Sequence, residues 1–141
     1  MDKTFLLALA LVCVALAGNC GADARADAVH TPKKGSAEEH GIFKSLQGSP
    51  AHSYKVHYLK VHNGWAWADV TPLDTKGKPV AEGGPQFLRQ KAGIWTVLDL
   101  SKVPDDPNDP LGAQDASVGF IKNLRKKYPA VPKDIFPKPS H

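Results

Sequence analysis

The chain has 141 residues, of which 42% are hydrophobic, and carries a formal net charge of +4 at pH 7. This length suits one domain with a modest hydrophobic core that needs no disulfide bonds, and the two cysteines, Cys13 and Cys20, both lie near the start. The positive excess is small and dispersed, so a solvated surface explains it and nucleic acid is excluded as an expected partner.

Residues 1–28 have the three-part order of a secretory signal peptide. Lys3 precedes an apolar stretch from Phe5 to Ala17, and small residues in A-x-A patterns follow. The apolar stretch has about 13 residues, whereas a helix needs roughly 20 to cross a bilayer. We therefore predict a cleaved leader and a periplasmic or secreted protein that is not transmembrane after cleavage.

The small-residue rule allows cleavage after Ala17, Ala24 or Ala28, and the two later positions are favoured. Cys20 offers an alternative, because a lipidated cysteine at this place would anchor the domain as a lipoprotein. Asn19 separates Cys20 from the small residues that such processing requires, which weakens this alternative.

A polar arm is expected at residues 29–35, and the folded domain is predicted to span residues 36–141. The arm has too little apolar surface to fill a core, so we expect it to be flexible. Ser36 and Glu39 fit the S-x-x-E capping box that begins a helix. Apolar residues follow at helical spacing before Gly48, namely Ile42, Phe43 and Leu46.

A first hairpin is predicted from Ser53 onward. Apolar residues alternate with polar ones, but their phase shifts near Tyr58, which indicates a β-bulge. Asn63 and Gly64 accept the positive φ angles of a tight turn, and a return strand follows at Trp65–Val70. One face of that strand carries only small side chains, which suits a closely packed helix; these are Ala66, Ala68 and Val70.

A long connection rich in proline and glycine, residues 71–85, leads to a second hairpin with arms at Gln86–Gln90 and Ile94–Leu100. Both faces of these arms are apolar, so we expect this hairpin nearer the middle of the sheet. The sequence thus predicts an α+β fold with a short N-terminal helix, a curved antiparallel sheet of two hairpins with about four strands, a C-terminal helix and a proline-rich tail.

The C-terminal part begins with an acidic, proline-rich loop, Pro104–Pro110, whose paired carboxylates are expected to be solvated. Asp115 is expected to cap the last helix. One stripe of that helix is apolar and comprises Val118, Ile121, Leu124 and Tyr128. In the tail, Ile135 and Phe136 are apolar enough to pack against the body of the domain.

The two hairpin sequences, YKVHYLKVHNGWAWADV and PQFLRQKAGIWTVLDLS, follow a short helix and are similar to hairpins of small exported bacterial proteins. The pattern resembles the cystatin-like and nuclear-transport-factor-like α+β rolls, and in particular uncharacterised periplasmic proteins of that kind. The resemblance spans residues 38–100. It implies a bent antiparallel sheet around a helix, in some cases with a pocket between them, and it implies no particular activity.

Trp65 and Trp67 stand two apart on one strand, and Tyr58 is expected to lie opposite them. Such an aromatic ladder would stack on sugar rings of the cell wall or on a protein partner, so these three residues are the candidate ligand-binding residues. The alternative is that both indoles pack beneath the C-terminal helix or tail. This second interpretation is the stronger for a tryptophan, whose burial removes a large apolar area from water.

His57 and Asp69 are the candidate catalytic residues, because the first hairpin could join them as an acid–base pair. No serine, cysteine or second carboxylate has an evident place beside them as a nucleophile. Other histidines are scattered, at positions 40, 52 and 62, so we expect no metal site and no cofactor.

We therefore predict a non-enzymatic periplasmic or secreted binding module. Its partner would be an envelope polymer, a small ligand or a protein, and a homodimer is left open. The alternative is a small enzyme with a pocket in the roll that uses His57 and Asp69.

Overall fold

The computed structural model describes residues 28–46, 53–109 and 111–138, and this part of the chain has an α+β fold. Helix α1 (Ala37–Ser45) precedes an antiparallel sheet and helix α2 (Val118–Lys127) follows it. The described strands lie in the order β1 (Ser53–His62), β2 (Trp65–Leu73), β3 (Gly84–Lys91) and β4 (Ile94–Leu98). The predicted class and the two consecutive hairpins are confirmed. Apart from Ala28, the predicted leader with both cysteines lies outside the described residues.

Helix α1 begins at the predicted capping box. Ser36 is the N-cap, and its Oγ accepts a hydrogen bond from the Glu39 backbone N–H at 3.2 Å. The Glu39 carboxylate in turn accepts a bond from the Gly35 N–H at 2.6 Å. These bonds satisfy N–H groups that have no partner within the helix, so the first turn is stable and presents Ile42 to the sheet.

The first hairpin has the predicted bulge and turn. The pairing register of β1 with β2 shifts between Val56 and Tyr58. Asn63 and Gly64 have φ angles of 50° and 72°, as a tight two-residue turn requires. Strand β2 continues to Leu73, past the predicted end at Val70.

The second hairpin turns at Ala92 and Gly93, whose φ angles are 48° and 77°. Strand β3 lies inside the sheet between β2 and β4, whereas β4 is at an edge of the described sheet. The prediction that this hairpin lies near the middle of the sheet is therefore right for β3 and wrong for β4.

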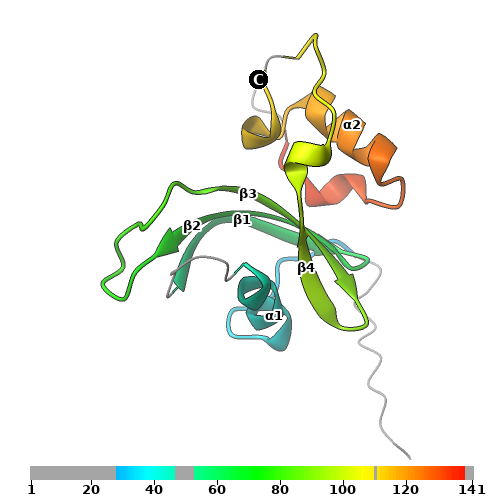
Figure 1. The fold of residues 1–141 in the computed structure, drawn as a ribbon. Helices are drawn as coiled ribbons and strands as arrows, with labels where there is room; N and C mark the ends of the chain where they lie inside the picture. The colour runs from blue at the N-terminus through cyan, green and yellow to red at the C-terminus, as the bar shows by residue number, and fades with distance from the viewer. Residues whose placement is uncertain (1–27, 47–52, 110, 139–141) are drawn as a thin grey trace, which may run out of the picture.

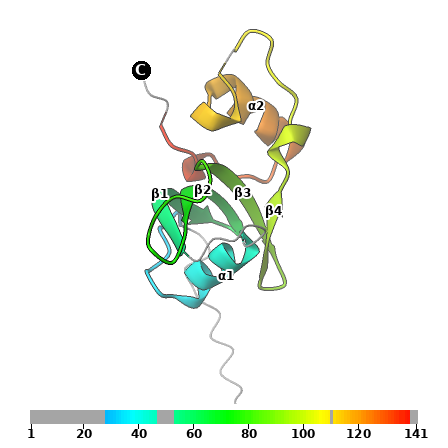
Figure 2. The ribbon, with the colours of Figure 1, turned by 60° about the vertical axis from the view of Figure 1, so that its left-hand side comes forward.

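Apolar layers cover both faces of the sheet, with α1 on one side and α2 with the C-terminal segment on the other (Figure 1; Figure 2). On the first face, Ile42 packs with the small residues of β2, as predicted, and with Trp95 of β4. On the second face, Ile135 and Phe136 of the tail are buried beside Phe120 of α2, so the tail packs against the body as predicted.

Helix α2 begins differently from the prediction. Ser117 is the N-cap, and its Oγ accepts from the Phe120 N–H at 3.3 Å, whereas Asp115 belongs to a preceding 3-10 helix, Ala113–Asp115. The buried face also differs, because Val118 is 65% exposed while Phe120 and Leu124 are buried. The predicted stripe was therefore out of phase at its first residue.

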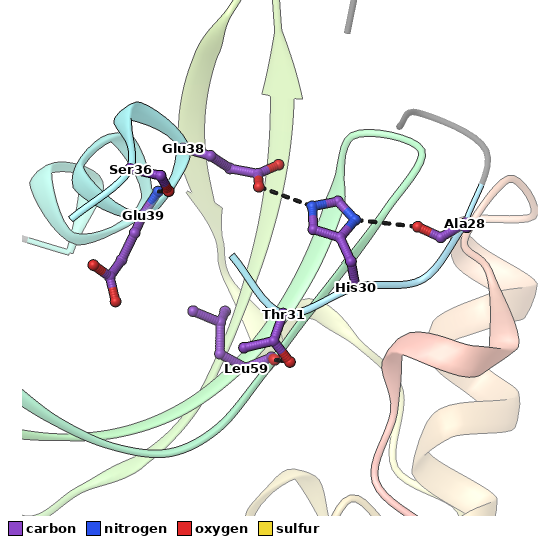
Figure 3. A network of polar contacts seen from close by, with 7 residues as sticks. All are labelled: Ala28, His30, Thr31, Ser36, Glu38, Glu39 and Leu59. Carbon is purple, nitrogen blue, oxygen red and sulfur yellow. Dashed lines mark hydrogen bonds and ion pairs between the residues drawn. The ribbon is translucent and has the colours of Figure 1, made fainter. Parts of the chain in front are cut away.

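The segment expected to be a flexible arm is fastened to the edge of β1 at His30 and Thr31 (Figure 3). The backbones of His30 and Val61 exchange two hydrogen bonds, of 2.9 and 2.8 Å, and the Thr31 hydroxyl donates to the Leu59 carbonyl at 3.2 Å. The His30 imidazole lies 2.8 Å from a carboxylate oxygen of Glu38 and so joins this segment to α1.

Candidate functional site

The two tryptophans of β2 lie in the core and do not form an exposed ladder. Trp65 is 5% exposed and Trp67 is 1% exposed. The Trp67 ring centroid lies 5.2 Å from that of Phe136 in the tail and 6.5 Å from that of Phe120 in α2. The expectation of an open aromatic binding face is therefore corrected, because α2 and the tail cover that face of the sheet. The alternative, burial beneath the C-terminal helix and tail, is what the structure shows.

His57 and Asp69 are not joined as an acid–base pair. The bulge displaces His57 from the pairing register, so that Tyr58 is the partner of Asp69 across the hairpin. The His57 imidazole instead makes a hydrogen bond of 2.9 Å with the Thr71 hydroxyl at the exposed surface. The extra residue that the bulge adds to β1 shifts the cross-strand pairing by one position. The predicted catalytic pair of His57 and Asp69 is therefore corrected.

Three of the predicted residues do meet in one hollow between the sheet and the N-terminal end of α2. Tyr58, Trp67 and Asp69 form its sheet wall, and the cavity has a volume of about 470 Å³. The opposite wall comes from the loop before α2, its first turn and the tail; it includes Asp109, Leu111, Gln114, Asp115, Ser117, Val118 and Pro137. We call this cavity the acidic hollow.

The charge of the acidic hollow is of one sign. Asp69, Asp109 and Asp115 line it, and among the residues that the structure describes no lysine, arginine or histidine belongs to its lining. Among the described residues, the carboxylates of Asp69 and Asp115 make no hydrogen bond or ion pair, so they remain available to a ligand. The hollow therefore favours a cationic group over an anionic one.

Other polar groups in the hollow are already used by the fold. The Asp109 carboxylate accepts from the Gly119 N–H at 2.7 Å and from the Leu111 N–H at 3.2 Å. The Ser117 hydroxyl caps α2 and also donates to the Leu111 carbonyl at 3.1 Å. Ser117 is thus committed to structure and is not placed as a nucleophile.

Tyr58 contributes a phenol that stays protonated. Burial raises the pKa of Tyr58 above its ordinary value, and the negative charge of Asp134 raises it further. Its hydroxyl can therefore donate to a ligand and accept from one at neutral pH.

The opposite wall of the hollow was missed in the sequence. From the sequence, only the paired carboxylates Asp105 and Asp106 are expected to be solvated, and Asp109 has no assigned role. In the structure Asp109 folds back onto α2 and lines the hollow together with Leu111 and Gln114. The aspartates of this loop are evident in the sequence, but no local pattern indicated that one of them would bind the first turn of α2. Asp115 was expected only as a helix cap.

Within residues 28–46, 53–109 and 111–138, no group of three or more histidines, cysteines or carboxylates is arranged to hold a metal ion. His62 makes a 2.7 Å hydrogen bond with Asp134, and His52 lies outside the described residues. The same part of the chain contains no helix with the length and apolar character needed to cross a membrane.

Comparisons with protein-family models, with curated proteins and with solved structures find no match for this chain.

Proposed function

We propose that the protein is a non-enzymatic binding module that works outside the cytoplasm, in the periplasm or after secretion, and holds a cationic group of its ligand in the acidic hollow. The observation that carries this proposal is the set of three carboxylates around a cavity of about 470 Å³, whose lining includes no basic residue from the described part of the chain. Ligand sites of proteins commonly have volumes of roughly 300 to 1,000 Å³ and a few convergent polar groups.

The chemistry of the hollow suits an ammonium or guanidinium group. Such a group would form charge-assisted hydrogen bonds with the Asp69 and Asp115 carboxylates, and these bonds are stronger in a partly buried site than in water. The Tyr58 hydroxyl and the Gln114 amide lie in the same lining and would orient the rest of the ligand.

An enzymatic role through His57 and Asp69 is the weaker proposal, because His57 is bonded to Thr71 and not to Asp69. The leader pattern of residues 1–28 supports the proposed location outside the cytoplasm. Lipid attachment at Cys20 is the alternative to release of the cleaved domain. The order of one helix and two antiparallel hairpins supports the proposed kinship with the cystatin-like and nuclear-transport-factor-like rolls. The bulge in β1 supports the curvature expected of such a sheet.

A pair of matched probes tests the cation site. We expect N-acetyl-lysine amide to shift the backbone NMR signals of residues around the acidic hollow, and N-acetyl-norleucine amide, which lacks the charge, to leave them unchanged. Asp69→Asn should weaken binding of the lysine probe by about fivefold or more, because the ammonium group loses one carboxylate partner. Glu82→Gln removes an exposed carboxylate that does not line the hollow and should change nothing. Equal binding of the two probes would refute the proposal.

A further inference from the structure

A second hollow runs along α2, between that helix and the C-terminal segment. Its volume is about 710 Å³. Four basic residues line it, namely Lys122, Arg125, Lys126 and Lys133, around apolar surface from Ile121 and Phe136. Within residues 28–46, 53–109 and 111–138, no acidic residue belongs to this lining. We call it the basic groove.

The cations of the basic groove are not neutralised by the fold. Within the described ranges, no ion pair joins any of its four basic side chains to a carboxylate. The Arg125 Nε donates to the Val131 carbonyl at 3.2 Å, which holds the guanidinium in place and leaves its Nη donors for another acceptor. A held guanidinium loses less conformational entropy on binding a carboxylate than a free one does.

The basic groove and the acidic hollow adjoin. Val118 and Pro137 belong to the lining of both, and Val118 is an exposed apolar side chain. The surface along α2 therefore passes from three carboxylates, over an apolar strip, to four cations. Carboxylates near the first turn of α2 and cations toward its last turn also complement the helix dipole, but the dipole does not account for the two cavities or for the apolar strip between them.

We infer that one extended polypeptide segment of a partner protein binds across both sites. A basic side chain of the segment enters the acidic hollow, an apolar side chain rests on Val118 and Pro137, and acidic side chains lie in the basic groove. Each cavity alone has the size of a small-molecule site, so a ligand that fills both is a chain. The placement of the basic side chain rests on the proposed function of the acidic hollow.

Charge complementarity selects a polypeptide with both signs over a uniformly anionic partner. A lipid surface or a nucleic acid that met the basic groove would also bring negative charge against the neighbouring carboxylates of the acidic hollow. At physiological ionic strength, charges interact over roughly 8 Å, so adjoining sites are not screened from one another.

Fluorescence polarisation with labelled peptides tests the inference. The probe is Lys-Ala-Leu-Pro-Glu-Glu, made in this order and in reverse, and its two controls replace Lys by norleucine or both Glu by Gln. We expect the mixed peptide, in one of its two orders, to bind about tenfold or more tighter than either control, because both charge sets contribute.

Charge variants then assign each end of the peptide. Lys122→Glu with Lys126→Glu should weaken binding of the mixed peptide about tenfold, whereas the control that keeps Lys and replaces both Glu by Gln should bind no more weakly than it does to the unaltered protein. Lys76→Glu with Lys91→Glu makes the same charge change at exposed positions outside the groove and should have no effect.

The outcomes separate the two proposals. If the groove variant binds the mixed peptide as the unaltered protein does, or if neither order of the mixed peptide binds tighter than its controls, the inference is overturned, while the lysine probe still reports on the acidic hollow. If Asp69→Asn leaves lysine binding unchanged, the proposed function fails on its own evidence. Vesicles of phosphatidylglycerol and phosphatidylcholine that sediment the protein and displace the mixed peptide would assign the basic groove to an anionic membrane and refute the polypeptide.

Discussion

At the scale of single residues, the two hairpin turns differ in how well their sequences suit their backbones. Both turns place two consecutive residues at positive φ, Asn63 with Gly64 and Ala92 with Gly93. Asparagine and glycine tolerate this region, whereas the Cβ of alanine approaches the following carbonyl oxygen there and costs about 1 to 2 kcal/mol. The second turn therefore retains strain at Ala92 that the first turn avoids.

Ala92→Asn should raise the free energy of unfolding by about 1 kcal/mol, because asparagine is the preferred residue at this turn position. Urea denaturation monitored by tryptophan fluorescence measures the change. Ala81→Asn is the matched control, since Ala81 is also exposed in a loop and does not have positive φ. An unchanged denaturation midpoint for Ala92→Asn would show that the turn at residues 92 and 93 is not of this type.

At the scale of elements, the first turn of α2 is held by two capping groups from different segments. Ser117 caps the Phe120 N–H, and the Asp109 carboxylate reaches the Gly119 N–H from the acidic loop. A carboxylate at this end of a helix also interacts favourably with the helix dipole. Glycine at position 119 makes this approach feasible, because a Cβ there would lie 2.5 Å from Asp109 Oδ2.

Gly119→Ala should lower the free energy of unfolding by about 1 kcal/mol. Displacing Asp109 loses a charged cap worth about 2 kcal/mol, which exceeds the gain of up to about 1 kcal/mol from replacing glycine by alanine in a helix. Thermal denaturation compares this variant with Gly112→Ala, where a Cβ would meet nothing within 4 Å. A stabilised Gly119→Ala would mean that Asp109 does not hold the end of α2.

At the scale of the whole molecule, one sheet separates two apolar layers, and Trp67 is central to the layer beneath α2. Its ring packs with Phe87 of β3, Phe120 of α2 and Phe136 of the tail, at centroid distances of 6.3, 6.5 and 5.2 Å. Three segments that are distant in sequence thus meet on one side chain, which couples the sheet to the C-terminal region.

Trp67→Ala should lower the free energy of unfolding by about 3 to 5 kcal/mol, a large part of the roughly 5 to 15 kcal/mol typical of a domain. Chemical denaturation followed by circular dichroism gives the value. Ile94→Ala is the control, because Ile94 is 69% exposed and a surface change of this kind costs about 0.5 kcal/mol or less. Denaturation of Trp67→Ala at the midpoint of the unaltered protein would show that α2 and the tail do not cover this face.

Local features of the fold were readable from the sequence because each depends on neighbouring residues. The capping box at Ser36, the phase shift at Tyr58 and the Asn63–Gly64 turn are patterns within a few positions of the chain, and all three are present. Alternation along β2 likewise separated its small face from its aromatic face, since successive side chains of a strand point to opposite sides.

Only the tertiary structure decided what covers each face and which residues line the cavities. Periodicity shows that Trp65 and Trp67 share a face, but the same pattern fits an exposed platform and a buried layer equally well. In the structure α2 and the tail cover this face, so the layer is buried. Asp109 reaches α2 across ten residues of chain, so no local spacing could place it beside Asp69. The acidic hollow and the basic groove therefore arise from packing between distant segments, whose free energy depends on contacts that a local sequence pattern does not specify.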